Sequence, residues 1–513
     1  MSFAKVYSGQ THLLSAHIVT IEVDISRGLH SFSVVGLPDK AVEESRDRIS
    51  AAIKNSGFTS PKHKNQKVVI SLAPAELKKE GAIFDLGMAL VYLHASGDIV
   101  FEPSKKLFLG ELALDGTLRP THGILPIVHE AKKQGFTEVF VPANNTAEAS
   151  LIHGMHIYGA NTLKEVIRHI DTKENFSLTR APHHKHECSH YAPLIDFSDI
   201  RGQQSAKRGL EIAAAGGHNI ALFGPPGTGK TMLARAFPGI LPPFLYEDII
   251  EVTSIHSIAG LLSEKSLITT PPFRTPHHTA SYVSIVGGGN ALRPGEVTLA
   301  HRGVLFLDEF PEFDRRVIEA LRQPLEDRTV SISRARGSAT FPAQFMLIAS
   351  MNPCPCGYHG SSNRECTCAP HMLLRYQKKI SGPIIDRIDL WIEVPEVPHH
   401  LLKETGRLSE GSLCIKERVG SARKIQYERF KEHPQNIRLN SEMNTRDLEH
   451  HAHLGNDAKH TLTQSAQTLG LSARSYHRVI KLARTIADLS QSSTITENHI
   501  LEALQYRPKS ISR

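Results

Sequence analysis

The sequence has few cysteines and no long apolar run. Only six of its 513 residues are cysteine, which excludes the disulfide-built folds of small secreted proteins. No apolar run reaches the length needed to cross a bilayer, and the first residues, MSFAKVY, lack the apolar core of a signal peptide. We therefore expect a cytoplasmic protein without a membrane segment.

The composition is that of a folded protein with an excess of basic residues. Hydrophobic residues make up 40% of the chain and charged residues 22%, values typical of globular domains. The length predicts about two to four domains, and no fixed-period repeat is visible. The net charge of +7 permits binding to nucleic acid without establishing it.

Residues 220–231, IALFGPPGTGKT, combine an apolar run with a glycine-rich motif. The run predicts a buried strand, residues 232–237 predict a helix, and the motif G-x-x-x-x-G-K-T is typical of a phosphate-binding loop. Glycines let the backbone curve closely around phosphates, and the helix N-terminus favours negative charge. We expect Lys230 to reach the β- and γ-phosphates of ATP and Thr231 to bind Mg²⁺. The predicted nucleotide contacts here are Gly224, Pro225, Pro226, Gly227, Thr228, Gly229, Lys230, Thr231 and Met232.

Two further apolar runs end in polar residues that suit ATP hydrolysis. The run 304–307, VLFL, is followed by Asp308 and Glu309. We expect Asp308 to share the Mg²⁺ with Thr231, and Glu309 to polarise the attacking water. The run 345–349, FMLIA, leads to Asn352, which is expected to orient that water or contact the γ-phosphate. An ordinary acidic turn is the alternative for the two acids, but their position after a phosphate loop favours an ATPase.

Residues 1–170 alternate predicted strands and helices. Apolar and polar residues alternate over 18–25 as in a half-buried strand. Further strands are predicted at 31–35, 68–72 and 139–142, with helices around 41–53 and 85–93. The next segment, 171–192, has little apolar periodicity and is predicted to be a linker. Its cluster of His183, His184, His186, Cys188 and His190 could ligate a metal, but a solvated polar linker is the preferred interpretation.

Residues 329–340 predict a β-hairpin with arginines at or near its tip. Arg334 and Arg336 could contact DNA phosphates there without reading bases. An exposed charged hairpin with no ligand is the alternative. Upstream, three consecutive glycines at 287–289 predict a flexible loop.

Four of the six cysteines lie within residues 354–368 in the pattern C-x-C…C-x-C. Cys354, Cys356, Cys366 and Cys368 could form a closed tetrahedral site for a structural Zn²⁺. The spacing within each pair is shorter than the usual C-x₂-C. Two reduced thiol pairs, or a redox pair, remain as alternatives.

The ordered set of motifs resembles the YifB/ComM family of magnesium-chelatase-like AAA+ ATPases. Residues 36–48, GLPDKAVEESRDR, resemble the N-terminal domain of that family, which is similar to the protease domain of Lon and to domain 2 of ribosomal protein S5. Ile83 stands where Lon has its nucleophilic serine, and Leu125 where Lon has its lysine. A Lon-type peptidase needs both groups, so the resemblance implies the fold without the protease activity.

The same resemblance assigns roles to single residues. Ile200 and Gly202 match a segment that lies over the adenine in AAA+ proteins. Gly287–Arg293 matches a loop that points into a central pore, and a surface excursion is the alternative. Arg387, in the sequence IIDRID, matches an arginine finger that reaches the ATP of a neighbouring subunit, and a salt-bridged loop arginine is the alternative. Arg474 matches the sensor 2 arginine, and whether it acts in cis or in trans is left open.

Residues 435–513 resemble the helical lid of AAA+ proteins. Val479, Leu482, Ile486 and Leu489 fall on one helical face. The neighbouring Arg478, Lys481 and Arg484 are expected to form a solvated basic face.

The resemblance implies an α/β fold: an AAA+ P-loop ATPase core with a helical lid, preceded by a Lon-protease-like, S5 domain 2-like α+β domain. The expected boundaries are 1–170 for the Lon-like domain, 171–192 for the linker, 193–395 for the ATPase core, 396–434 for a connector and 435–513 for the lid.

The function implied by the resemblance is that of a hexameric ATPase that translocates on DNA. It is expected to use ATP and Mg²⁺, to bind single-stranded and branched duplex DNA through Arg293, Arg334 and Arg336, and to promote branch migration during natural transformation. A motor subunit of a metal chelatase, acting on a protein partner, is the alternative. A DNA-binding regulator with an inactive ATP site is disfavoured by the intact nucleotide motifs.

Overall fold

The computed structural model describes residues 3–508 except 183–194, 263–266, 290–292, 335–336, 362–363 and 398–409. The chain divides into two compact units. The first comprises Met1–Cys188 and Leu245–Ile268, and the second comprises Ser189–Phe244 and Thr269–Arg513. No helix among the described residues is long and apolar enough to cross a membrane. The predicted histidine-rich cluster, His183, His184, His186, Cys188 and His190, lies outside the described residues.

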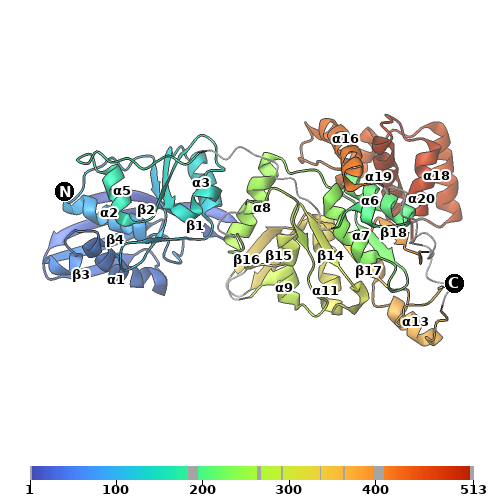
Figure 1. Ribbon diagram of the computed structural model, residues 1–513, viewed down its shortest axis with the longest axis horizontal. Helices are drawn as coiled ribbons and strands as arrows, with labels where there is room; N and C mark the ends of the chain where they lie inside the picture. The colour runs from blue at the N-terminus through green and yellow to red at the C-terminus, as the bar shows by residue number, and fades with distance from the viewer. Residues whose placement is uncertain are drawn as a thin grey trace. The chain divides into compact units, whose positions relative to one another are not determined.

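The first unit is built on a seven-stranded sheet with the order β3-β4-β2-β1-β5-β8-β9 (Figure 1). β2 pairs antiparallel with both β1 and β4, and the other neighbouring strands pair in parallel. The strands are β1 Phe3–His12, β2 Ser15–Arg27, β3 Ser31–Val35, β4 Gln66–Ala73, β5 Lys106–Phe108, β8 Glu138–Pro142 and β9 His156–Ala160. A separate short hairpin joins β6 Glu111–Leu112 to β7 Leu118–Arg119.

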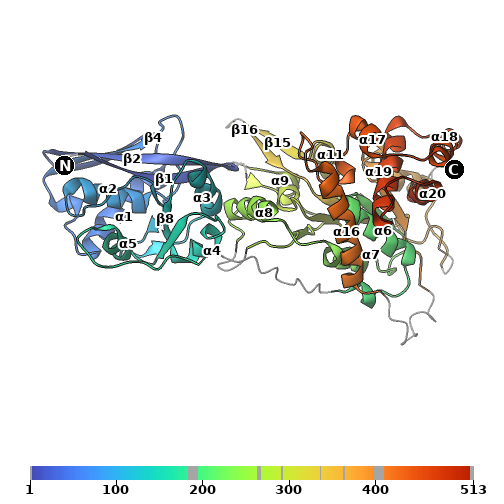
Figure 2. The same cartoon turned by 90° about the horizontal axis from the view of Figure 1, so that it is seen from above.

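Helices cover one face of this sheet. Val19, Ile21 and Val23 of β2 are buried, while the residues between them are partly exposed, which confirms the predicted half-buried strand. Helix α2 packs on β1 and β2, and α1 lies beside it (Figure 2). The helices are α1 Lys40–Asn55, α2 Asp85–Ser96, α3 Ile124–Lys133, α4 Thr146–Ala149 and α5 Leu163–Ile170.

A buried ion pair joins α1 to α2. Asp85, at the start of α2, accepts a hydrogen bond from Arg48 Nε at 2.7 Å and another from Ser45. Burial raises the pKa of Asp85, although the guanidinium of Arg48 opposes that shift. Ile83 and Leu125, the residues at the two peptidase positions, both lie in the apolar core.

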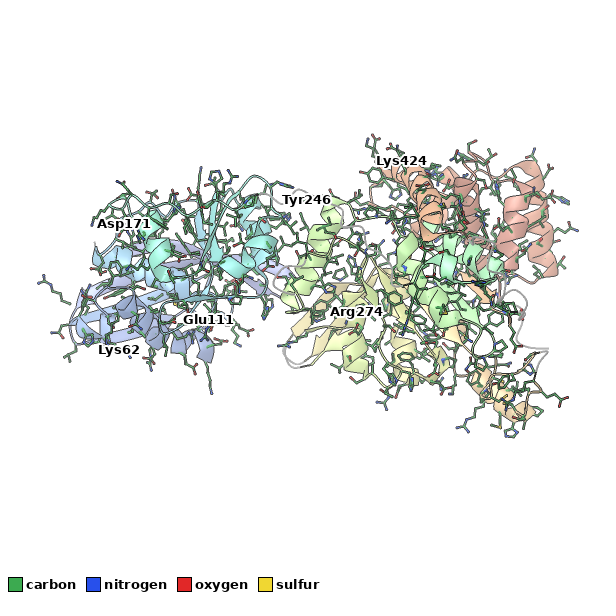
Figure 3. All side chains as sticks on the ribbon, viewed as in Figure 1. Lys62, Glu111, Asp171, Tyr246, Arg274 and Lys424 are labelled. Carbon is green, nitrogen blue, oxygen red and sulfur yellow. The ribbon has the colours of Figure 1, made fainter. Side chains whose placement is uncertain are left out.

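Helix α8, Tyr246–Ile258, belongs to the first unit although it follows the phosphate loop in sequence. Ser257 donates a hydrogen bond to the buried carboxylate of Glu148 at 2.8 Å. The hydroxyl of Tyr246, labelled in Figure 3, donates to the carbonyl oxygen of Leu151 at 2.6 Å. The predicted ATPase segment contains this helix, so the chain leaves the second unit to form α8 and then returns.

The second unit contains a five-stranded parallel sheet with the order β11-β14-β17-β10-β18. β14 and β17 are buried along their whole length, as expected of central parallel strands covered on both faces. The strands are β10 Ile220–Phe223, β11 Phe273–Arg274, β14 Val304–Leu307, β17 Met346–Met351 and β18 Leu390–Glu393. The runs predicted at 220–223 and 304–307 are therefore strands with the expected bounds.

Short helices and two hairpins surround this sheet. The hairpin predicted at 329–340 is present as an antiparallel pair, β15 Thr329–Arg334 and β16 Gly337–Pro342. A smaller one pairs β12 Gly287–Gly288 with β13 Arg293–Pro294. The helices before β18 are α6 Gln204–Gly216, α7 Lys230–Ala236, α9 Tyr282–Val286, α10 Glu296–Leu299, α11 Arg315–Ala320, α12 Arg322–Asp327, α13 Pro370–Gln377 and α14 Gly382–Ile385.

The C-terminal part of the second unit is helical. Its helices are α16 Ser412–Phe430, α17 Thr445–His451, α18 Asn456–Thr468, α19 Ala473–Leu489 and α20 Glu497–Gln505. α16 packs against α6 and α19 (Figure 1). Its buried residues Ile415, Val419 and Phe430 belong to the core of the unit.

The predicted solvated basic face on α19 is wrong. Arg484 is 1% exposed and donates to the buried carboxylate of Asp488 at 2.9 Å. Lys481 donates to a backbone carbonyl oxygen at 3.0 Å, and Arg478 lies 3.5 Å from a carboxylate oxygen of Asp389. The sequence pattern placed these three side chains on one side of α19. The groups that accept their hydrogen bonds lie in another turn of α19 and in other segments of the chain, so the pattern did not reveal that the side chains are paired.

We predict that Asp488→Ala destabilises the second unit strongly. Asp488 also accepts hydrogen bonds from Arg429 and Asn440, so its removal leaves two guanidinium groups without their buried carboxylate. Losing one partner of a buried ion pair costs about 3–5 kcal/mol. Urea unfolding followed by circular dichroism should show the loss, with Asp457→Ala on the exposed side of α18 as the control. Equal unfolding midpoints for the two variants would contradict the prediction.

Candidate functional site

The phosphate loop connects β10 to α7, as the motif predicts. Gly227 and Gly229 have φ angles of 78° and 90°, a region of backbone conformation that favours glycine. Lys230, the first residue of α7, donates hydrogen bonds to the carbonyl oxygens of Gly224 and Pro225, each at 2.7 Å. Burial lowers the pKa of Lys230 to about 8. The ammonium group is thus held over the loop that would receive the phosphates.

The segment expected over the adenine is tied to this loop. Gln203 donates hydrogen bonds through Nε2 to the carbonyl oxygens of Thr228 at 3.3 Å and Pro395 at 2.6 Å. Ile200 is buried, whereas Met232 is exposed on α7. Gln203, which carried no prediction, follows Gly202 directly and is the residue that makes this connection.

The end of β14 and the first turn of α7 bring the predicted magnesium ligands together. Asp308, directly after β14, accepts a hydrogen bond from Thr231 Oγ1 at 2.9 Å. Its other carboxylate oxygen accepts from the hydroxyl of Ser350 and from the backbone N–H of Glu309, the latter at 3.1 Å. A hydroxyl and a carboxylate are oxygen ligands of the kind that Mg²⁺ prefers. Both side chains therefore fit a magnesium site.

Asn352 and Glu309 lie at the same edge of the sheet. Asn352, directly after β17, accepts a hydrogen bond from Lys230 Nζ at 3.2 Å. Glu309 is exposed, and its carboxylate lies 3.2 Å from Nδ1 of His278. Sequence reasoning assigned no role to His278 or Ser350. The position of Ser350 near the end of a predicted strand was a usable signal, but no spacing linked His278 to an acid.

The two arginines with predicted roles meet at one carboxylate. Arg387, after α14, and Arg474, in the first turn of α19, each donate to a different oxygen of Glu326 on α12. Arg387 also donates to the carbonyl oxygen of Pro383 at 2.7 Å. Burial lowers the pKa of Arg387, and nearby guanidinium groups, first that of Arg474, add to the shift. Among the described contacts, neither arginine touches Lys230.

The four clustered cysteines have sulfur atoms within 4.8 Å of one another. Cys354 Sγ lies 3.3 Å from Cys356 Sγ and 3.8 Å from Cys366 Sγ. The buried Cys354 sulfur also accepts backbone N–H groups of Gly357 at 3.2 Å and His359 at 3.3 Å. Four cysteine sulfur atoms in this proximity fit a structural zinc site. Cys368 completes the set.

Two of the three residues predicted to contact DNA lie in the two hairpins. Arg334 ends β15, where it pairs with Gly337 in the register of the hairpin. Arg293 begins β13 and is exposed. Arg336 lies outside the described residues. The structure thus places the two described arginines at hairpin ends.

Three family models match the chain. The model described as "Magnesium chelatase, subunit ChlI" matches residues 196–402. Those described as "Subunit ChlI of Mg-chelatase" and "Magnesium chelatase, subunit ChlI C-terminal" match residues 21–145 and 409–507. Together they cover most of both units.

Curated relatives match along the whole chain. "Competence protein ComM" of Haemophilus influenzae is 42% identical over 510 residues, which span 99% of this chain and 98% of the relative. "Uncharacterized protein YifB" of Escherichia coli is 42% identical over 509 residues, 99% of this chain and 97% of that protein. "DNA replication licensing factor Mcm6" of Drosophila melanogaster is 24% identical over 347 residues, 63% of this chain and 38% of that protein.

The lowered pKa of Lys230 predicts a pH dependence of nucleotide binding. A pKa near 8 means that the amine is protonated below that pH and loses its proton above it. The negatively charged polyphosphate of ATP favours the protonated form of Lys230. At higher pH the protein therefore takes up a proton when it binds ATP. We expect a constant affinity for Mg·ATP between about pH 7 and 7.5, and a fall of up to about tenfold per unit above pH 8.

Calorimetry at constant ionic strength checks this expectation, because the heat in two buffers of different ionisation enthalpy gives the number of protons taken up. Uptake that rises above pH 8 together with weaker binding is the expected result. Affinity that stays level to pH 9.5, with no proton uptake, would contradict it.

Proposed function

Since the chain belongs to the YifB/ComM family of magnesium-chelatase-like ATPases, we propose that it is a cytoplasmic ATP-driven motor that works as a hexameric ring on DNA. Its task in this proposal is branch migration of recombining DNA during natural transformation. The observation that carries the proposal is the meeting of Lys230, Thr231, Asp308 and Asn352 at one edge of the parallel sheet. These groups suit phosphoryl transfer, in which positioning and charge stabilisation supply most of the catalysis.

Each residue of the proposed site has one task. Lys230 binds the β- and γ-phosphates, and Thr231 and Asp308 hold Mg²⁺, which when bound neutralises charge on the phosphates. Glu309 accepts a proton from, or polarises, the attacking water, and Asn352 orients it. The exposure of Glu309 leaves its carboxylate accessible to that water.

The positions of Arg387 and Arg474 support a ring. Both form ion pairs with Glu326, and neither contacts Lys230 of its own chain among the described contacts. An arginine that stabilises the transition state can come from a neighbouring subunit. In this proposal both arginines act on the nucleotide of the adjacent copy, so that Arg474 acts in trans.

Three features support DNA as the substrate. The name of one full-length relative refers to competence, and that of a partial relative to DNA replication. The chain carries a net charge of +7, and Arg293 and Arg334 lie in hairpins. In this proposal Arg293, Arg334 and Arg336 contact phosphates of single-stranded and branched duplex DNA without reading bases.

The proposal also assigns the fold of the first unit, the C-terminal helices and the four cysteines. The first unit is proposed to be a Lon-like, S5 domain 2-like domain that has lost peptidase chemistry, since Ile83 and Leu125 are apolar and buried. The helices that follow β18 are proposed to form the AAA+ lid. The four cysteines are proposed to bind one structural Zn²⁺.

A motor subunit of a metal chelatase is the second candidate. The descriptions of the three matching family models favour it. It would use the same ATP site, but its ATP hydrolysis would depend on a protein partner and would not respond to DNA. The full-length relative named "Competence protein ComM" favours the DNA motor.

ATP hydrolysis measured with and without DNA separates the two candidates. We expect single-stranded and four-way junction DNA to stimulate turnover about tenfold or more, because DNA would organise the ring in which the arginines reach the nucleotide. Lys230→Ala should abolish both basal and stimulated turnover. Strand-exchange assays on three- and four-stranded junctions should show ATP-dependent branch migration.

The same assay has a clear contrary outcome. Electrostatic binding to DNA is strongest at low salt. A protein that hydrolyses ATP but neither binds DNA at low salt nor responds to it would contradict the DNA motor and favour the chelatase-type subunit.

A further inference from the structure

The segment that carries the four cysteines is continuous with the nucleotide site. We call residues 353–369, between β17 and α13, the cysteine insert. It begins directly after Asn352, which accepts a hydrogen bond from Lys230. Cys354, the most buried of the four cysteines, is two residues from Asn352. The cysteine insert is therefore joined through Pro353 to a residue of the proposed ATP site.

The first turn of the insert also touches the phosphate loop. A Cβ atom added to Gly357 would lie 2.8 Å from Cδ and 3.2 Å from Cγ of Pro226, and 3.9 Å from Cγ of Asn352. Distances below 3.0 Å are too short for real Cβ contacts, so the backbone of Gly357 already packs closely on the Pro226 ring. Pro226 stands inside the loop between Gly224 and Lys230.

Cys354 holds this turn in place. Its sulfur accepts the backbone N–H groups of Gly357 at 3.2 Å and His359 at 3.3 Å, and its carbonyl oxygen accepts the N–H of Gly357 at 3.0 Å. Gly357 has a φ of 88°, which only glycine adopts without strain. A thiolate bound to metal accepts hydrogen bonds more strongly than a neutral thiol. Metal at the four cysteines would therefore hold the turn against Pro226.

The other end of the cysteine insert leads into a helix that passes near Asn352. Helix α13, Pro370–Gln377, starts two residues after Cys368. Its Tyr376 is buried, and burial raises the pKa of its hydroxyl, which lies near the backbone of Asn352. The insert therefore begins after Asn352, is followed by a helix whose Tyr376 lies near Asn352, and contacts Pro226 in between.

We propose that metal occupancy of the four cysteines controls the affinity for ATP, by holding the turn 354–359 against Pro226 and Asn352. The proposal rests on the zinc site put forward above but not on DNA as the substrate. Coupling between two binding sites is reciprocal. Bound ATP must therefore tighten zinc binding by the same factor by which zinc tightens ATP binding.

A pair of glycine variants tests the contact. Gly357 and Gly360 both lie in the insert at positive φ, but a Cβ at Gly360 meets nothing within 4 Å. Gly357→Ala and Gly360→Ala thus share the backbone strain and differ in the contact with Pro226. We expect both variants to retain zinc, measured by mass spectrometry of the metal content. Only Gly357→Ala should bind a fluorescent ATP analogue more weakly, by about tenfold.

The full chain without substitution provides a second test, which does not depend on the folding of a variant. We compare the affinity for the ATP analogue in zinc-loaded and zinc-stripped protein, and the affinity for zinc in competition with a chelator with and without ATP. The expected result is weaker ATP binding after zinc removal and tighter zinc binding with ATP, by equal factors.

Three results would overturn the inference. The first is equal ATP affinity in the loaded and stripped protein. The second is equal loss of affinity in the two glycine variants. The third is a chain that binds no zinc, which would also remove the proposed zinc site. Zinc binding without any effect on ATP would refute the coupling alone and leave the proposed ATPase intact.

Discussion

The parallel pairing of β10, β14 and β17 is the constraint on which the candidate site depends. Parallel strands end at the same edge of a sheet, so the residues that follow them converge although they are far apart in sequence. The result is the 2.9 Å contact between Thr231 and Asp308 and the 3.2 Å contact between Lys230 and Asn352. The strands themselves are apolar and buried, and they hold these polar groups on a rigid support. The phosphate loop, the acids and the amide therefore form one site rather than three separate motifs.

A second group of residues contacts a different carboxylate, that of Glu326. Arg387 and Arg474 come from separate segments and meet at Glu326. Two guanidinium groups beside one exposed carboxylate leave a local excess of positive charge, and this suits an additional anion such as a phosphate group. This arrangement supports the ring proposal, because a neighbouring copy can bring its nucleotide to these arginines. The cysteine insert, which touches Pro226, adds a means by which metal binding could adjust the same nucleotide site.

Local sequence patterns predicted the strands and loops that carry the candidate site. They failed for side chains whose position depends on contacts between distant parts of the chain. The apolar runs and the motif spacing predicted β10, β14 and the positions of the residues at their ends, because these depend on a few adjacent residues. The same kind of pattern wrongly predicted a solvated Arg484, whose burial depends on Asp488 and on neighbouring carbonyl groups. Nor could it show that Arg474 meets Glu326, 148 residues earlier in the chain, or that α8 packs in the first unit. These contacts depend on the folded chain and have no signature in a short window of sequence.

The central claim is that one active site takes groups from two neighbouring chains. Mixing Lys230→Ala with Arg387→Ala tests it most directly, since each variant alone lacks one half of every site. In rings of equal mixture, about a quarter of the interfaces would join an intact Lys230 to an intact Arg387 from the next copy. We therefore predict that the mixture regains about a quarter of the wild-type ATPase activity while each variant alone stays inactive. A mixture that forms mixed rings yet stays as inactive as its components would contradict the claim.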